Sequence, residues 1–515
     1  MNKKYIKSVF TLLLSLTILS SCNDLSVENL NNPDTERALN SEADLVTLAE
    51  GLYYEWYTSL NTWAGFGIGT SVLADAASSS WGNFGMREFG TEPRPAINNS
   101  PSWGYLYAMS NPFSYLYAIN SSATDVMNAL QNETLNFGNE AKKIEALAKF
   151  GQGMSMGYAA LIFDQGYIVD ETTSLDELAN PVLVSYDDLM THALEKLEEA
   201  AKLAEDNAFD VGTSIINSTD GGLSSTQFAE VIHSYTARLL ANVARNSTER
   251  ALVNWDKVIS HIQKGVKQDF TMVLDQWASG YWWNSRYIYS TRSGWTNVDM
   301  RIINMMNPAY PAHNPDGADF AQTDSATIYD TPSIDNRLFT DYGYNPSNFH
   351  RPERGLYFFS NWRYTRHAAY DGSYEGTMED ISLSEIHMLH AEALAQNGNL
   401  AGAATILNDP SGYRKTRGGL PDVAANKNDI MKAIHHERMI EQYLDAPGAE
   451  WFDMRGMDML QAGSPLHFPI PADILESLGC QQPFYTYGGS SAPPTGNCAP
   501  EGDYWTNGTS QGGWR

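Results

Sequence analysis

The sequence predicts a mostly α-helical protein in which tetratricopeptide-like helical hairpins form a scaffold for a loop-rich, irregular ligand-binding region. Apolar residues recur at helical spacing through much of residues 41–266 and again through residues 381–478. Between these parts, residues 267–380 keep no period and are rich in Gly, Pro, Asn, Asp and aromatic residues. Long irregular segments of compact proteins usually carry function, so we expect the binding site in this middle part.

The composition is that of a globular protein and argues against one class of partner. Of the 515 residues, 43% are hydrophobic and 18% are charged, which allows a large buried core. The 33 basic and 61 acidic residues give a formal net charge of −28. Because a phosphate backbone is bound by clustered Lys and Arg, we expect no nucleic-acid partner.

The N-terminus has the layout of an export signal. Three lysines precede an apolar run from Val9 to Leu19, which is too short to cross a bilayer as a helix. The following residues up to Cys22 resemble a bacterial lipobox, which predicts that a signal peptide, residues 1–21, is removed and that Cys22 is lipidated. The alternative is an ordinary secretory signal followed by a chance cysteine. Lipid on Cys22 would anchor the chain to a membrane, with residues 22–40 as a tether.

Residues 41–266 are predicted to form the N-terminal helical part of a single body that spans residues 41–515. Ser185 has the chemistry of an N-cap, and two aspartates follow it in the first turn of the helix. Three segments carry apolar stripes at helical spacing: Ile144, Leu147, Ala148, Met154, Tyr158, Leu161 and Ile162; Leu189, Ala193, Leu197, Ala200 and Ala204; and Phe228, Val231, Ile232, Tyr235, Leu239 and Val243. The breaks between these segments are short, which favours antiparallel helix pairs.

The loop-rich part, residues 267–380, contains an unusual concentration of rings. Seven aromatic residues lie in the nineteen positions from Trp277 to Trp295, interleaved with Asn, Arg, Gly and Ser. A buried strand would carry aliphatic residues in strict alternation. The mixture of flat rings and hydrogen-bonding groups instead favours a surface that grips a ligand.

Helical order returns in the C-terminal helical part, residues 381–478. Ile386, Leu389, Ala393 and Leu394 form one stripe, and a turn at residues 397–399 leads into a second helix, which predicts a tetratricopeptide-type hairpin. The tail, residues 479–515, holds Cys480 and Cys498. In an oxidising compartment we expect these cysteines to form a disulfide; two free thiols or a metal pair are the alternatives.

A series of short motifs runs along nearly the whole chain in a definite order. The lipobox is followed by "CNDL", and "SPSWGYLYAMSNPFSYLYAINSS" and "AKKIEALAKFGQGMSMGYAALIFDQGYIVD" come next. Later segments are "IDNRL", "SNWRY", "LSEIHMLHAEALAQNGN", "HHERMIEQYLDAPGAEWFDMRG" and "LHFPIPADIL". In order and spacing these motifs resemble the SusD/RagB family of bacterial surface lipoproteins. His390 is a departure, because the family often has Arg at this position.

The resemblance implies capture and delivery rather than catalysis. It implies an outer-membrane lipoprotein that faces the exterior, binds an oligosaccharide or polysaccharide, and passes it to a SusC-like TonB-dependent barrel in polysaccharide utilisation. We therefore expect a nutrient glycan as the ligand and no enzymatic activity. Peptide capture, as in the RagB branch, is one alternative. An envelope-anchored glycan-degrading enzyme is a less favoured one.

The candidate ligand-binding residues follow from the chemistry of sugars. A pyranose has an apolar face that stacks on a ring and a rim of hydroxyls that needs polar partners. The candidates in the middle part are Tyr281, Trp282, Trp283, Asn284, Arg292 and Trp295, with Arg286, Tyr287 and Asn297 as further members. The resemblance implies that a loop early in the mature chain also faces the ligand, which adds Trp81 and Asn83. Trp103 begins a periodic helix and is predicted to pack.

We predict no catalytic residue and no metal ligand. His387 and His390 share a helix with acidic neighbours, but inside the predicted hairpin packed or surface histidines are favoured over metal ligands. The adjacent residues His435, His436 and Glu437 face different directions, which favours a solvated helix. A glycosidase would need two facing carboxylates, and no segment marks such a pair.

No cofactor is predicted, although a structural calcium ion is left open. The segment "NPDGAD", residues 314–319, shares a few features with calcium loops but lacks their twelve-residue ligand pattern.

Overall fold

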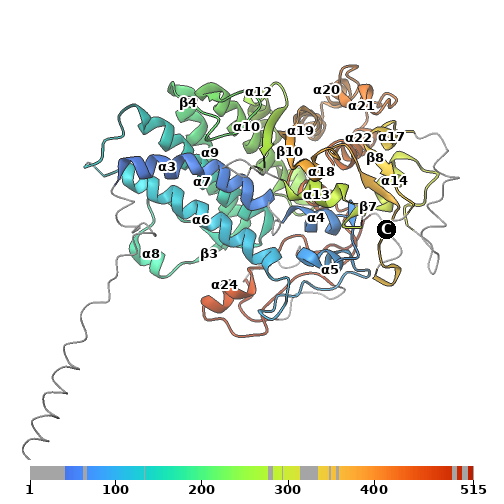
Figure 1. Ribbon diagram of the computed structural model, residues 1–515, viewed down its shortest axis with the longest axis horizontal. Coiled ribbons are helices and arrows are strands. Elements are labelled where there is room, and N and C mark those ends of the chain that lie inside the picture. Colours follow the sequence, from blue (N-terminus) through green and yellow to red (C-terminus); the bar gives the residue numbers. More distant parts are fainter. Residues whose placement is uncertain are drawn as a thin grey trace, which may run out of the picture.

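The computed structural model of this chain is dominated by helices, as Figure 1 shows. It describes residues 41–61, 66–132, 134–275, 282, 284–292, 294–313, 334–346, 349–354, 359–489, 496–500 and 508–513. Within these ranges the strands form five sheets of only two strands each. The mostly α-helical fold class predicted from the sequence is confirmed.

The long helices pack one against the next in chain order and form what we call the helical stack. Its members are α3 (Glu42–Asn61), α6 (Tyr107–Leu130), α7 (Ala141–Ile162), α9 (Tyr186–Asp206), α10 (Ser225–Asn242), α12 (Trp255–Lys264), α19 (Leu383–Gln396), α20 (Leu400–Leu407) and α22 (Lys427–Ile440). The apolar stripes predicted from the sequence lie in α7, α9 and α10, and nearly all of their residues are buried.

Two glycines of helix α7 let its neighbours α9 and α10 approach closely. A Cβ atom on Gly153 would lie 2.5 Å from Cγ of Leu197 in α9. A Cβ atom on Gly157 would lie 2.7 Å from Cδ1 of Leu239 in α10. Larger side chains at these positions would force the helices apart, and packed interiors tolerate little extra volume.

Local capping chemistry sets the helix boundaries that the sequence predicted. Ser185 is the N-cap of α9, and its hydroxyl accepts a hydrogen bond from the Asp188 amide at 3.2 Å. Asn399 is the N-cap of α20 and accepts from the Gly402 amide at 3.0 Å. The preceding Gly398 has a φ of +81°, so the chain reverses there between α19 and α20. The predicted hairpin is confirmed.

The middle part of the chain leaves the stack and returns to it through one β-ribbon. Helices α12 and α19 pack on each other although 118 residues separate them. Strand β6 (Phe270–Asp275) follows the first helix, strand β10 (Glu375–Ile381) precedes the second, and the two strands pair antiparallel. We call the residues between these strands the excursion. Its described elements are α13 (Ser285–Thr291), β7 (Asn297–Val298), α14 (Met300–Met306), α17 (Arg337–Thr340), β8 (Tyr342–Tyr344), the 3-10 helix η3 (Pro352–Arg354), β9 (Trp362–Tyr364) and α18 (Tyr370–Ser373).

An early loop of the chain joins the excursion. Its elements are α4 (Gly67–Leu73), β1 (Ala77–Ser78), the 3-10 helix η1 (Asn83–Gly85) and α5 (Met86–Gly90). Strand β1 pairs antiparallel with β7, so that Ala77 lies opposite Val298 and Ser78 opposite Asn297. This pairing brings together two loops that are more than 200 residues apart, and Figure 1 shows α4, α5 and β7 in one region.

The remaining elements complete the body. They are β2 (Gln165–Tyr167), α8 (Leu175–Ala179), β3 (Leu183–Ser185), β4 (Asp210–Val211), β5 (Leu223–Ser224), α11 (Ser247–Leu252), α21 (Tyr413–Thr416), α23 (Ala449–Gly456), α24 (Ala472–Ser477) and the 3-10 helix η2 (Gly138–Glu140). In the tail, Cys480 and Cys498 form a disulfide, with their Cα atoms 6.0 Å apart. Among the described residues, no helix combines the length and apolar character that a membrane span requires.

Candidate ligand-binding surface

The pairing of β1 with β7 places two of the predicted tryptophans on adjoining loops. The hydroxyl of Ser79, just after β1, donates to the carbonyl oxygen of Trp295 at 2.8 Å. The indole N–H of Trp81 donates to the carbonyl oxygen of Gly294. The early loop and the excursion therefore form one continuous surface at this point.

Six side chains from four segments of the chain gather there, and we call them the Trp81–Trp295 surface. Its members are Trp81, Asn83, Arg292, Trp295, Phe349 and Tyr374. Two of its rings face solvent, since Trp81 is 48% exposed and Phe349 is 67% exposed. Asn83 is also exposed, whereas the other three side chains are partly buried. Exposed rings next to hydrogen-bonding groups are one form that a ligand-binding surface takes.

Arg292 holds the polar centre of this surface. Its Cζ atom lies 4.9 Å from the ring centroid of Trp295 and 5.9 Å from that of Tyr374, which permits cation–π attraction to both. Its guanidinium donates to Oδ1 of Asp371 at 2.6 Å and to the hydroxyl of Tyr374 at 2.8 Å. The hydrogen bond with Asp371 raises the pKa of Arg292, so the side chain is a fixed cation.

A second layer of rings supports the exposed one. The ring of Tyr289 lies 4.7 Å from Trp295 and 5.4 Å from Phe84, measured between centroids. Burial raises the pKa of Tyr289 to about 12, although its hydrogen bond with Asn83 acts in the opposite direction. The phenol is therefore neutral at physiological pH, and Asn83 is tied to the same layer that supports Trp295.

Phe349 reaches this surface because Gly294 makes room for it. A Cβ atom on Gly294 would lie 3.1 Å from Cβ of Phe349, and the φ of +84° at Gly294 also favours glycine. The next residue, His350, lies with Nε2 3.3 Å from the carbonyl oxygen of Ser78 in β1. The hydrogen bond of His350 thus ties the segment that carries Phe349 to strand β1, which lies just before Trp81 in the chain.

The arrangement is suited to holding a ligand that has both apolar faces and polar edges. Ring faces contribute through the apolar area they bury, and they keep water away from neighbouring hydrogen bonds. Arg292 and Asn83 supply donors beside the rings. Asp371, the acid beside these groups, accepts from Arg292 at 2.6 Å.

Trp282 is a correction to the sequence prediction. Its exposed fraction is only 6%, so the expectation that its ring faces solvent is wrong. The amide of Asp275, at the end of β6, donates to the carbonyl oxygen of Trp282 at 2.7 Å and fixes its backbone there. The indole packs on Tyr54 and Tyr57 of α3, with ring centroids 5.1 Å and 5.2 Å away.

Asn284 is a second correction, because it is 3% exposed and serves the structure. Its side chain caps α13 by accepting from the Arg286 amide at 2.9 Å and donates to the side chain of Asn61 at 3.2 Å. The further candidates Arg286, Tyr287 and Asn297 are buried as well. Arg286 Nη1 donates to the Leu444 carbonyl oxygen at 2.5 Å, so this polar group holds backbone rather than ligand.

Some predictions fall on residues outside the described ranges. These are Tyr281, Trp283, Cys22 and the segment at residues 314–319. Trp103 packs partly buried against the core, as its position at the start of a periodic helix predicted.

Three residues at the site were missed by reasoning from the sequence: the members Phe349 and Tyr374, and Asp371, which pairs with Arg292. Each stands in a short Gly-, Pro- or Asn-rich stretch, "NPSNFHRPERG" or "YDGSYEG". A lone ring in such a stretch is a usable signal, because an irregular loop offers it little core to enter. The contact partners of these rings, however, come from other loops and leave no mark in the local sequence.

The acids next to the histidines considered as metal ligands, Glu385 and Glu392, have other partners. Glu392 binds Arg250 and Arg438, and Glu385 binds Arg238, all as ion pairs. No group of three or more His, Cys, Asp or Glu side chains suited to a metal ion lies within the described ranges.

The prediction of a solvated helix at His435 and Glu437 is wrong. These side chains are 6% and 1% exposed. His435 lies 2.7 Å from Asp453, and Glu437 accepts from both terminal nitrogens of Arg337 at 2.8 Å and 2.9 Å. Charged partners from distant segments therefore cover this face of α22.

Comparison with known proteins finds one matching family model and a set of solved structures with a similar fold. Residues 232–466 match the model of the SusD family. Among curated proteins, none matches the chain by sequence. Similar solved structures include a SusD-like carbohydrate binding protein from Bacteroides vulgatus ATCC 8482, with 15% identity over 82% of this chain and 86% of that chain and a TM-score of 0.55.

Two further structures show the same likeness. A SusD-like protein from Bacteroides fragilis NCTC 9343 has 12% identity over 81% of this chain and 86% of that chain, with a TM-score of 0.56. A structure solved with xylogluco-oligosaccharide has 14% identity over 80% of this chain and 82% of that chain, with a TM-score of 0.51. At these identities the likeness shows a shared fold.

Proposed function

We propose that this chain, a SusD/RagB-family protein by its ordered motifs, its matched segment and its fold, captures an oligosaccharide on the Trp81–Trp295 surface. The observation that carries the proposal is the meeting of two exposed rings with a fixed guanidinium on loops joined by β1 and β7. A similar structure was solved with xylogluco-oligosaccharide, which supports a glycan as the ligand class.

We further propose that the bound glycan is delivered to a SusC-like TonB-dependent transporter and that the protein catalyses no reaction. This rests on the family resemblance and on the pairing with Arg292 of Asp371, the acid beside the rings. Binding without turnover is then the whole task, and affinity arises from ring stacking and shielded hydrogen bonds.

The proposed location is the outer membrane, facing the exterior, with the chain held by lipid on Cys22. The N-terminal signal pattern supports this proposal. Labelled palmitate should be incorporated into the wild-type protein and not into Cys22→Ala. Equal labelling of both would refute lipidation at this residue. Co-purification of the wild type with an outer-membrane barrel would support the delivery step.

Binding of the mature chain, residues 22–515, to panels of plant and microbial glycans and of peptides tests the ligand class. We expect binding to at least one glycan, with Trp81→Ala and Phe349→Ala each weakening it about ten-fold, equivalent to ~1.4 kcal/mol. Tyr115→Ala is the matched control, since Tyr115 is an exposed ring on α6 and should leave binding unchanged. Binding to peptides alone, or release of free sugars from the bound glycan, would refute the proposal.

A further inference from the structure

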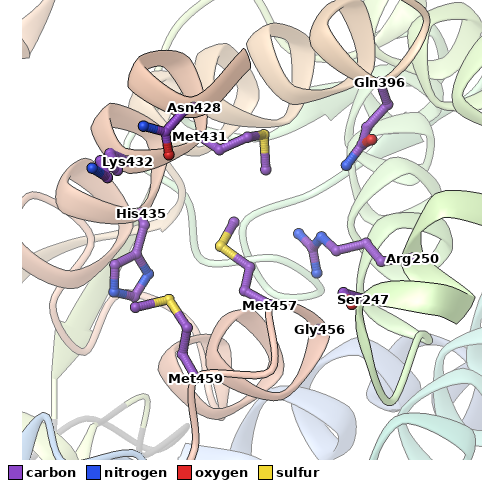
Figure 2. Close-up of a pocket in the computed structure, with 10 residues that line it drawn as sticks. All are labelled: Ser247, Arg250, Gln396, Asn428, Met431, Lys432, His435, Gly456, Met457 and Met459. Atoms are coloured by element: carbon purple, nitrogen blue, oxygen red, sulfur yellow. The ribbon is translucent and has the colours of Figure 1, made fainter. Parts of the chain in front are cut away.

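A cavity of about 290 Å³ lies among α11, α19, α22 and the end of α23, and it shares no residue with the Trp81–Trp295 surface. Figure 2 shows the side chains that line it. Met431 points in from α22, Met457 faces it from the chain after α23, and the guanidinium of Arg250 reaches in from α11. The cavity therefore combines apolar walls with one buried cation.

Arg250 has a hydrogen-bond donor that no protein group uses. The residue is 2% exposed, and its Nε and Nη2 atoms donate to the two carboxylate oxygens of Glu392 at 2.5 Å and 2.7 Å. Its Nη1 atom is buried and has no hydrogen-bond partner. Buried donors are nearly always satisfied, so a donor left open at a cavity wall points to a ligand.

The position of Nη1 depends on Gly456, the last residue of α23. A Cβ atom on Gly456 would lie 2.3 Å from Nη1 and 3.3 Å from Cζ of Arg250. Any other residue would therefore displace the guanidinium. Glycine at this position and the two hydrogen bonds to Glu392 together fix the position of Nη1 on a residue that lines the cavity.

The charge of the lining favours an anion. Two cationic side chains, Arg250 and Lys432, line the cavity and no Asp or Glu does, although the chain as a whole carries a net charge of −28. Lys432 is exposed at the rim, where it can attract an anion without being desolvated. A carboxylate oxygen is the acceptor that fits a guanidinium N–H best.

The three methionines that line the cavity, Met431, Met457 and Met459, define the rest of the ligand. Methionine side chains are flexible and polarisable, so they adapt to apolar groups of different shapes. The volume lies near the lower end of the ~300–1,000 Å³ of ordinary ligand pockets, which suits a small molecule and not a polymer.

We propose that this cavity is a second binding site, separate from glycan capture, that takes a small monocarboxylate with an apolar body. The carboxylate accepts a hydrogen bond from Arg250 Nη1, and the apolar body lies among the three methionines. This assignment does not depend on the proposed glycan function, because it rests on different residues.

Octanoate and 1-octanol, titrated by calorimetry into the mature chain, test the proposal. We expect saturable one-site binding of octanoate and at least ten-fold weaker binding of the alcohol. Gly456→Ala should weaken octanoate binding at least ten-fold by displacing Nη1. Gly51→Ala is the matched control, because its new Cβ in α3 would meet only Glu55 at 3.9 Å, and it should bind octanoate like the wild type.

A second pair of variants keeps the test decisive if Gly456→Ala does not fold. Met431 is partly exposed, so Met431→Glu and Met431→Gln should both fold. We expect Met431→Glu to abolish octanoate binding by adding a competing carboxylate, and Met431→Gln to retain it within about three-fold. Absence of saturable octanoate binding, equal affinity for 1-octanol, or equal effects of the Glu and Gln variants would overturn the proposal.

Discussion

The helical stack and the excursion use the same kinds of residue with different outcomes. In the stack, the residues of each predicted stripe are almost all buried, because helical periodicity places them on one face. Trp282 in the excursion is 6% exposed, whereas Trp81 in the early loop is 48% exposed. Both tryptophans stand in irregular sequence that contains other rings. Whether a side chain of an irregular segment is buried thus depends on which distant helix or strand packs against that segment.

A buried network of charges joins the two regions. Asp335 and Arg337 come from the excursion, whereas Glu437 and Glu441 lie in α22 and at its end. Arg337 donates to all three carboxylates at distances of 2.7–2.9 Å, and it is 0% exposed. Since both regions supply charges, this network positions the excursion, and with it the binding loops, against the stack.

The largest effect should follow from breaking this network. Arg337→Met leaves three buried carboxylates without their shared cation, and removal of one partner of a buried ion pair costs about 3–5 kcal/mol. We expect the free energy of unfolding, measured by denaturant titration, to fall by this amount. Arg351→Met is the control, since Arg351 is exposed and its ion pair with Glu353 is long, at 4.0 Å. This variant should change the free energy of unfolding by less than ~0.5 kcal/mol. Equal effects of the two variants would contradict a joining role for Arg337.

The next effect separates the two kinds of tryptophan. Trp282→Ala removes a buried ring that packs on α3, and we expect a loss of about 3 kcal/mol in the free energy of unfolding. Trp81→Ala removes a ring that is already 48% exposed, so the loss in the free energy of unfolding should stay below ~1 kcal/mol. Thermal and denaturant unfolding of both variants would measure the difference. If Trp81→Ala were as destabilising as Trp282→Ala, the contrast between a core ring and a binding ring would fail.

The sequence was a reliable guide where one segment determines its own environment. The N-cap at Ser185, the hairpin of α19 and α20 and the buried face of α10 all follow from residues within one turn or one stripe. The ordered motifs also resembled the SusD family, whose model matches residues 232–466.

The candidate site could be predicted only in part. Trp81, Asn83, Arg292 and Trp295 meet as one surface, but Trp282 and Asn284 are buried against α3. Nothing near position 282 in the sequence indicates that tyrosines more than 200 residues earlier cover its ring. Glu437 was misplaced for the same reason, because its partner Arg337 lies 100 residues away.

A smaller effect in the excursion should depend on pH. Burial lowers the pKa of His350 to about 4, below the ~6.5 of an unfolded histidine. The folded state therefore disfavours the protonated ring, so the contribution of His350 to stability is complete above pH ~6.5 and is lost as the pH falls towards 4. We expect the stability difference between the wild type and His350→Gln to shrink over this range in denaturant titrations. A difference independent of pH would show that protonation of His350 does not loosen the segment carrying Phe349.

The smallest change in stability, with a clear change in binding, is expected for Arg292→Lys. The ion pair with Asp371 is partly exposed, at 31% and 25% of the two side chains, so its loss should cost less than ~1 kcal/mol. Lysine keeps the charge but not the planar group over Trp295 or the simultaneous hydrogen bonds to Asp371 and Tyr374. The ring of Trp295 should then be held less firmly, and glycan affinity should fall about three- to ten-fold.

Arg87→Lys provides the matched control for this last comparison. Arg87 also forms a surface ion pair, with Glu88 at 2.7 Å, and it lies on the same early loop as Trp81. If charge alone mattered, both variants would bind the glycan like the wild type. If the orientation of the rings matters, only Arg292→Lys should weaken binding, with unfolding curves that remain close to the wild type for both. Weakened binding by Arg87→Lys as well would mean that the binding region extends along the early loop beyond the Trp81–Trp295 surface.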